Sequence, residues 1–101
     1  MKRQSLNDGS EWFDIDKARE YREDTTFDGS NNISCATGSQ WDHQALYLTA
    51  SGRWVLNCWS QWAGTLDSWE EIDSESAVTW MIKNGHEDEE IVEEAMAARE
   101  M

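Results

Sequence analysis

The sequence predicts a small α+β fold, in which helices pack on one face of an antiparallel sheet of three to four strands. Three observations lead to this prediction. A β-hairpin pattern spans residues 45–60, two helical patterns follow it, and 101 residues are enough for one domain and no more. The expected order of elements is strand, helix, three strands and two helices, all within a single acidic domain over 1–101.

The N-terminal part predicts one strand and one helix. Residues 1–10 are polar and are expected to be frayed, whereas Trp12-Phe13-Asp14-Ile15 indicates a short strand. Asp14 or Asp16 can then cap a short helix over Lys17–Glu23. The apolar residues on one face of that helix are Ile15, Ala18 and Tyr21.

Turn-forming residues crowd the stretch 25–44. Because a structureless loop of that length is rare inside a domain, we expect a short strand around Ile33–Ala36.

The strongest local signal is a hairpin around Ala50-Ser51-Gly52, with Gly52 in the left-handed conformation that such loops require. This loop sets Leu48 opposite Trp54 and Leu46 opposite Leu56. Side chains alternate between the faces of a strand, so a shift by one residue would scatter the apolar set over both faces. One predicted face holds Leu46, Leu48, Trp54, Leu56 and Cys58, and the other holds Tyr47, Thr49, Val55, Asn57 and Trp59.

The C-terminal part predicts a further strand and two helices. A turn at Ala63-Gly64-Thr65 leads to a strand around Ser68–Ile72, and Asp73 or Ser74 caps the next helix. Asn84-Gly85 ends that helix. Its buried stripe is expected to be Ala77, Trp80 and Met81, joined by Val78 and Ile82.

The last helix is expected to be amphipathic. Its first turn would hold Glu87, Asp88, Glu89 and Glu90, where the helix dipole favours anions. Its apolar stripe would be Ile91, Val92, Ala95, Met96 and Ala98.

The formal net charge of −13 is concentrated at one end of the sequence. Residues 66–101 hold 12 acidic side chains against Lys83 and Arg99, whereas residues 25–65 hold only Asp28, Asp42 and Arg53. This charge argues against direct binding to nucleic acid or to anionic membranes, and it favours a partner with a basic surface. Solubility is the alternative explanation of the acid excess.

The sequence predicts a protein of the bacterial cytosol. The N-terminal residues lack the apolar segment of a signal peptide, and no run approaches the roughly 20 apolar residues of a membrane span. In a reducing compartment, Cys35 and Cys58 are expected to be free thiols rather than a disulfide.

No motif indicates an enzyme or a cofactor. Cys35 and His43 could form a nucleophile–base pair, but coexistence in one chain is weak evidence for one. No cysteine or histidine pair has zinc-site spacing, and Asp28-Gly29-Ser30-Asn31-Asn32 lacks the alternating carboxylates of a calcium loop. We therefore expect no catalytic residue, no metal and no cofactor.

Several stretches of the sequence resemble stretches of other proteins, and the resemblance extends through Trp69-Glu70-Glu71-Ile72 to the helix ending near Asn84. They are Asn31-Asn32-Ile33-Ser34, Thr37-Gly38-Ser39-Gln40-Trp41, Leu46-Tyr47, Gly52-Arg53-Trp54-Val55-Leu56 and Trp59-Ser60-Gln61-Trp62. Over most of its length the chain resembles a family of short plasmid- and phage-borne proteins without an established activity. In size and charge, such proteins resemble anti-CRISPR and anti-restriction inhibitors, some of which mimic the phosphate backbone.

Charge and resemblance together predict an inhibitor of mobile-element origin that docks on a basic, nucleic-acid-binding defence protein, such as a CRISPR effector or a restriction enzyme. The negative field would come from Glu70, Glu71, Glu87, Asp88, Glu89, Glu90, Glu93 and Glu94. Specific contacts would come from Trp59, Trp62, Trp41 and His43, with Asn31 and Asn32. The alternatives are an interaction module that binds through its tryptophan-rich face or the 25–44 loop, and a small enzyme that uses Cys35 or His43.

Overall fold

The predicted hairpin is the centre of the structure, a computed structural model that describes residues 1–62, 64 and 66–100. Strand β6 (Asp42–Leu48) pairs with β7 (Trp54–Ser60). Leu48 lies opposite Trp54 and Leu46 opposite Leu56, which confirms the predicted register. Gly52 has a φ of 87°, so the loop takes the left-handed conformation that a glycine accepts without strain.

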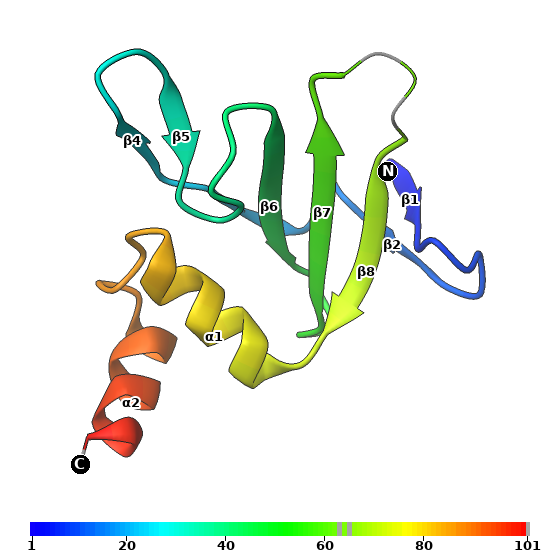
Figure 1. Ribbon diagram of the computed structural model, residues 1–101. Helices are drawn as coiled ribbons and strands as arrows, with labels where there is room; N and C mark the ends of the chain where they lie inside the picture. The colour runs from blue at the N-terminus through cyan, green and yellow to red at the C-terminus, as the bar shows by residue number, and fades with distance from the viewer. Residues whose placement is uncertain (63, 65, 101) are drawn as a thin grey trace.

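The hairpin extends on both sides into a four-stranded antiparallel sheet (Figure 1). Strand β3 (Arg19–Arg22) pairs with β6, and β8 (Ser68–Ile72) pairs with β7. Helices α1 (Ser74–Lys83) and α2 (Glu90–Arg99) follow β8. This arrangement confirms the α+β class, with β8 and α1 where the sequence predicts them.

Two short hairpins flank the sheet. Strands β1 (Arg3–Ser5) and β2 (Trp12–Asp14) form one, and β4 (Thr25–Phe27) and β5 (Asn32–Ser34) form the other. The strands expected at 12–15 and around 33–36 are therefore present. Residues 1–10, expected to be frayed, instead contribute β1. The turn expected at Ala63-Gly64-Thr65 falls on residues 63 and 65, which lie outside the described residues.

The prediction of a helix over Lys17–Glu23 is wrong, because Arg19–Arg22 within this segment form strand β3. Tyr21 is buried beside Leu46, whereas Arg19, Glu20 and Arg22 are exposed, so this edge strand buries one side chain against the core. Pairing with β6 satisfies backbone groups along an edge that would otherwise lack partners, and this tertiary gain overrides local helix propensity. The order of elements therefore differs from the predicted one.

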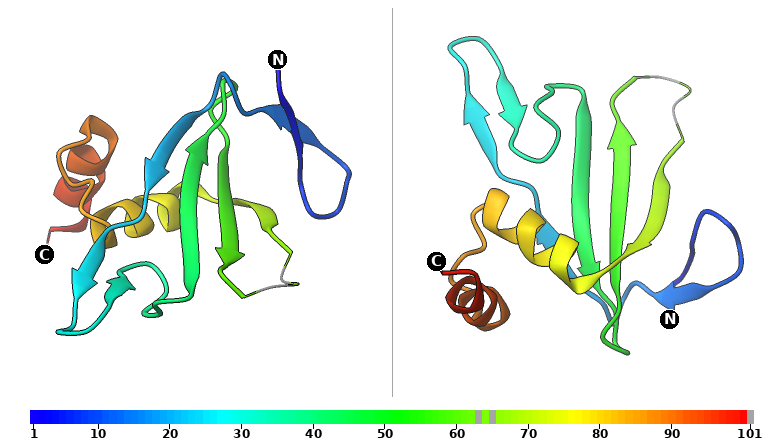
Figure 2. Two further views of the ribbon diagram at one scale, coloured as in Figure 1. Left: turned by 90° about the horizontal axis from the view of Figure 1, so that it is seen from above. Right: turned by 60° about the horizontal axis from the view of Figure 1, so that its bottom comes forward.

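Both faces of the sheet are covered. On one face, side chains of β3, β6 and β7 pack against the helices, in a cluster of Tyr21, Leu46, Trp54, Ala77, Trp80, Met81 and Val92. On the other face, the β1–β2 hairpin contributes to a second cluster of Phe13, Ala45, Tyr47 and Val55. Figure 2 shows this hairpin and α2 at opposite ends of the molecule.

Helix α1 has the ends that the sequence predicts. The Asp73 carboxylate accepts a hydrogen bond from the Ser76 backbone N–H at 2.7 Å, and Gly85 follows the helix with a φ of 80°. The buried Asn84 side chain accepts from the Asp24 N–H and donates to the Trp80 carbonyl. His86 Nε2 lies 2.7 Å from the Arg22 carbonyl oxygen. These contacts tie the end of α1 to the segment after β3.

Truncation of Leu46, at the centre of the core, tests the packing of the sheet against the helices. Leu46 is fully buried and touches the helical layer, so Leu46→Ala is expected to lower the free energy of unfolding by about 3 kcal/mol. The matched control is Leu66→Ala, at a side chain that is 89% exposed, with an expected change within about 0.5 kcal/mol. Urea denaturation of both variants measures the difference. Equal losses would contradict this description of the core.

Candidate functional site

Helix α2 carries a cluster of carboxylates without countercharges. Glu89 is the N-cap of α2, and Glu87 and Asp88 lie in the turn before it, so only Glu90 of the four predicted residues lies in its first turn. Arg19 binds the Glu89 carboxylate at 3.0 and 3.2 Å. Within the described part of the chain, no ion pair reaches the remaining carboxylates of this cluster, which belong to Glu87, Asp88, Glu90, Glu93 and Glu94.

The apolar side of α2 is mostly uncovered. Of the predicted stripe, only Val92 is buried, while Ile91 and Met96 are each 40% exposed. A shallow groove between the two helices is lined by Val78, Ile91, Ala95 and Ala98, with Glu75 and Glu94 beside them. The fold thus buries one side chain of the predicted apolar stripe and leaves Ile91 and Met96 partly exposed.

Two arginine side chains, Arg19 and Arg99, hold the two ends of α2. Glu89 is fixed by Arg19, and Arg99 donates to the Thr79 hydroxyl and to the Glu75 carbonyl oxygen, both at 3.2 Å. A short helix is marginal in water on its own, and α2 has one buried side chain to stabilise it. The helix is thus positioned with its carboxylates and its remaining apolar side chains facing outward.

The predicted acidic set is divided between separate places. Glu71 is bound by Arg53, and Glu70 accepts a hydrogen bond from the Asn7 side chain at 3.4 Å. Both lie on β8 and neither belongs to the α2 cluster. The eight carboxylates predicted to supply the negative field therefore lie in two places, on β8 and at α2, and Arg53 neutralises Glu71.

Trp41 and Trp62 form an exposed aromatic pair. Trp41 precedes β6 and Trp62 follows β7, at the end of the sheet that is uppermost in Figure 1. Their ring centroids are 5.1 Å apart with an interplanar angle of 44°, and the two residues are 41% and 61% exposed. The structure therefore joins two of the predicted contact residues into one surface feature.

His43 and Trp59 are instead mostly enclosed. Their rings stack with centroids 5.7 Å apart, and His43 Nδ1 lies 2.7 Å from Glu23 Oε2. The other Glu23 oxygen accepts from the Ser34 hydroxyl and from the Gln44 backbone N–H. His43 Nε2 is buried and has no hydrogen-bond partner among the described residues. Sequence reasoning missed Glu23, because the contact arises from the pairing of β3 with β6.

The remaining predicted contact residues lie in the β4–β5 hairpin. Asn32 pairs with Phe27 across the strands, and the Asn31 backbone N–H donates to the Asp28 carboxylate at 2.8 Å. Hydrogen bonds from Asn31 and Ser30 lower the pKa of Asp28. Asn31 and Asn32 are exposed and lie in a different hairpin from the tryptophan pair.

Cys35 and Cys58 are both free, as predicted, and both are half-buried. Cys35 donates its backbone N–H to the Asp24 carbonyl, whereas Cys58 Sγ accepts a hydrogen bond from the Gln44 side chain. Within 1–62, 64 and 66–100, no hydrogen bond joins Cys35 to His43. The arrangement lacks the contact by which a base would activate a nucleophile.

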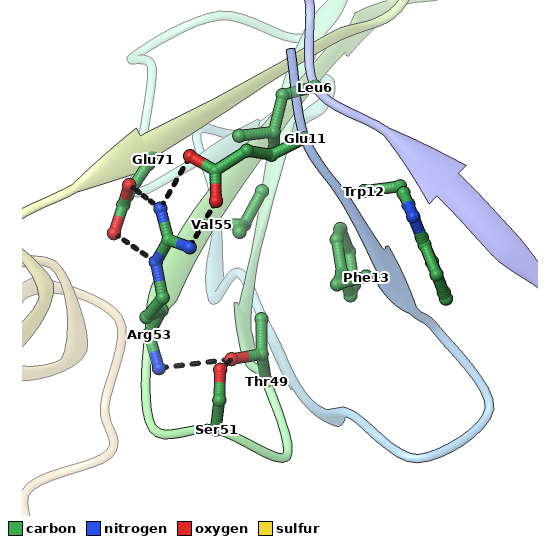
Figure 3. A pocket seen from close by; sticks show the side chains of 9 residues that line it. All are labelled: Leu6, Glu11, Trp12, Phe13, Thr49, Ser51, Arg53, Val55 and Glu71. Atoms are coloured by element: carbon green, nitrogen blue, oxygen red, sulfur yellow. Dashed lines mark hydrogen bonds and ion pairs between the residues drawn. The ribbon is translucent and has the colours of Figure 1, made fainter. Parts of the chain in front are cut away.

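A second pocket contains the other charge cluster of the fold (Figure 3). Arg53 follows the central hairpin loop, and its guanidinium lies between the carboxylates of Glu11 and Glu71 and bonds both. Glu11 belongs to the β1–β2 hairpin, so Arg53 connects that hairpin to β7 and β8. Hydrogen bonds from Arg53 lower the pKa of both Glu11 and Glu71, and these carboxylates raise the pKa of Arg53.

This cluster predicts a pH dependence of stability. A carboxyl group whose pKa is lowered by folding stabilises the native state above its unfolded pKa, here 4.5, and loses that contribution as pH falls below it. The wild-type midpoint of denaturation is therefore expected to fall more steeply between about pH 5 and pH 3 than that of Arg53→Met. Urea titrations at stepped pH measure both. Parallel curves would contradict a role for this cluster in stability.

Neither the described side chains nor comparison with known proteins indicates a metal site, a membrane-spanning helix or a family. In the described part of the chain, no three His, Cys, Asp or Glu side chains are grouped so that they could hold a metal ion. None of the described helices combines the length and apolar character that crossing a membrane requires. No protein-family model matches the sequence, and no significantly similar curated protein or solved structure was found.

Proposed function

We propose that the protein is a binding protein that docks on a basic surface of another protein through the outward side of α2. This surface, called here the α2 face, consists of Glu87, Asp88, Glu90, Glu93, Glu94, Ile91 and Met96. The proposed activity is inhibition by contact rather than catalysis.

One observation carries the proposal: α2 combines carboxylates that have no ion-pair partner among the described residues with apolar side chains that are partly exposed. By contrast, arginines pair with Glu11 and Glu71 in other parts of the fold, and Arg19 pairs with Glu89 at the start of α2. A helix with one buried side chain gains little from intramolecular packing. A basic partner with apolar side chains among its charges would complement both properties of this face.

The proposed class of partner is a nucleic-acid-binding protein, such as a CRISPR effector or a restriction enzyme. Such proteins carry extended basic surfaces for phosphate groups, and a row of carboxylates on a helix competes for the same positive field. The net charge of −13 adds long-range attraction to such a surface and repels nucleic acid itself.

The contacts of His43 favour this proposal over the enzyme hypothesis. One ring nitrogen lies 2.7 Å from Glu23 Oε2, and the other is buried away from solvent, which favours a structural role for His43. An interaction module that uses the tryptophan-rich face is the remaining alternative, and the exposed Trp41–Trp62 pair supports a role for that face.

Charge reversal on α2 tests the proposal. The variant Glu90→Lys/Glu93→Lys/Glu94→Lys leaves the Arg19–Glu89 contact intact and is expected to weaken partner binding at least about tenfold. The immobilised wild-type chain is used to capture bacterial proteins, and captured partners are titrated against both chains at rising salt. Binding is expected to weaken steeply between about 0.05 and 0.5 M salt, because the charges are exposed.

The control separates local charge from total charge. Asp16→Lys/Glu20→Lys/Glu70→Lys makes the same change in net charge, from −13 to −7, at exposed sites away from α2. It is expected to bind nearly as well as the wild type. Equal weakening by both triple variants, salt-independent binding, or a partner without a basic surface would overturn the proposal.

A further inference from the structure

The tryptophan pair at the open end of the hairpin has a defined position without being buried. The Trp41 backbone N–H donates to the Ser39 hydroxyl at 3.0 Å, and the Trp62 backbone N–H donates to the Ser60 hydroxyl at 3.2 Å. The Gln61 backbone N–H donates to the Trp41 backbone carbonyl at 2.9 Å, which links the two segments. The backbone therefore holds two indole rings side by side at the surface.

The other tryptophans are accounted for by contacts within the fold. Trp54, Trp59, Trp69 and Trp80 pack against the aromatic rings of Tyr21, His43, Tyr47 and His86. Trp12 is exposed, but the Arg3 guanidinium lies 4.5 Å from its ring centroid. Among the described residues, no cation lies over Trp41 or Trp62. This pair is thus an aromatic surface whose outer faces the fold leaves uncovered.

The charges around the pair favour a cationic ligand. The exposed Asp42 adjoins Trp41 in the sequence, and the only basic residue in 25–65 is Arg53, which Glu11 and Glu71 already bind. The negative faces of the indole rings attract cations, and a planar guanidinium stacks on them while it keeps its hydrogen-bond donors in water. The Arg3–Trp12 contact is an example of this geometry in the same protein.

We propose that the Trp41–Trp62 pair is a binding site for an arginine side chain of the basic partner. The inference rests on the proposed function, since it assumes a protein partner that presents basic residues. It adds a second contact at a different place from the α2 face: one surface supplies charge, and the other selects arginine over lysine.

Peptide titration of the full chain tests this site directly. The probes are three capped peptides in which glycine alternates with arginine, with lysine or with uncharged citrulline. The arginine peptide is expected to bind most tightly and to shift the indole N–H resonances of Trp41 and Trp62. Trp41→Leu/Trp62→Leu is expected to weaken this binding about five- to tenfold and to reduce the preference over lysine.

A control variant and a measurement on the wild-type chain separate loss of the arginine site from loss of stability. Trp12→Leu removes an exposed tryptophan that Arg3 already covers, and it is expected to bind the arginine peptide like the wild type. The indole N–H shifts are measured on the wild-type chain, so they report on the site even where a double variant loses stability.

The outcomes distinguish this inference from the proposed function. If charge reversal on α2 weakens partner binding while the arginine peptide leaves the Trp41 and Trp62 resonances unmoved, the proposed function stands and the arginine site is wrong. If α2 reversal has no effect while the peptide results hold, the proposed docking through α2 fails and the arginine site stands. Equal binding of the arginine and lysine peptides would overturn the arginine preference. Indole shifts produced by a neutral oligosaccharide such as cellohexaose, but not by the arginine peptide, would overturn the site as an arginine site.

Discussion

The antiparallel pairing of β6 with β7 is the constraint on which the rest of the structure depends. Its register places Leu46 and Trp54 on one face and Tyr47 and Val55 on the other. Because both faces are apolar, a sheet built on this hairpin exposes apolar surface unless both sides are covered. The helices cover one side and the β1–β2 hairpin covers the other, so elements far apart in the sequence serve the same hairpin.

Two groups of acidic side chains can be distinguished, those paired with arginines within the fold and those on α2. Where a covering element must be held to the sheet, carboxylates are paired with arginines, as Glu11 and Glu71 are with Arg53 and Glu89 is with Arg19. Exposed ion pairs contribute modestly to stability, but these connect elements distant along the chain and thereby fix their relative positions. The carboxylates of α2 have no such role, which is why they are the ones that we assign to a partner.

The tryptophans divide in a comparable way. Rings such as Trp54 and Trp80 lie in the core, where they bury a large area. Trp41 and Trp62 lie beyond the ends of β6 and β7 and are exposed. The same residue type thus stabilises the fold at one place and, at another, forms the exposed surface that we propose for recognition. The acidic helix and the tryptophan pair lie on different parts of the molecule, which suits a partner that presents both charge and specific side chains.

Local signals in the sequence determined the hairpin register, β8 and the ends of α1. Alternation, Gly52 and the Asp73 cap act between neighbouring residues, so they can be recognised without the fold. Only the tertiary structure decided that 19–22 is a strand, that α2 buries a single side chain, and that Trp41 meets Trp62. The Glu23–His43 contact spans 20 residues and the Glu11–Arg53 contact spans 42. Such pairs leave no periodic signal in the sequence, because they exist only once strand pairing has brought distant segments together.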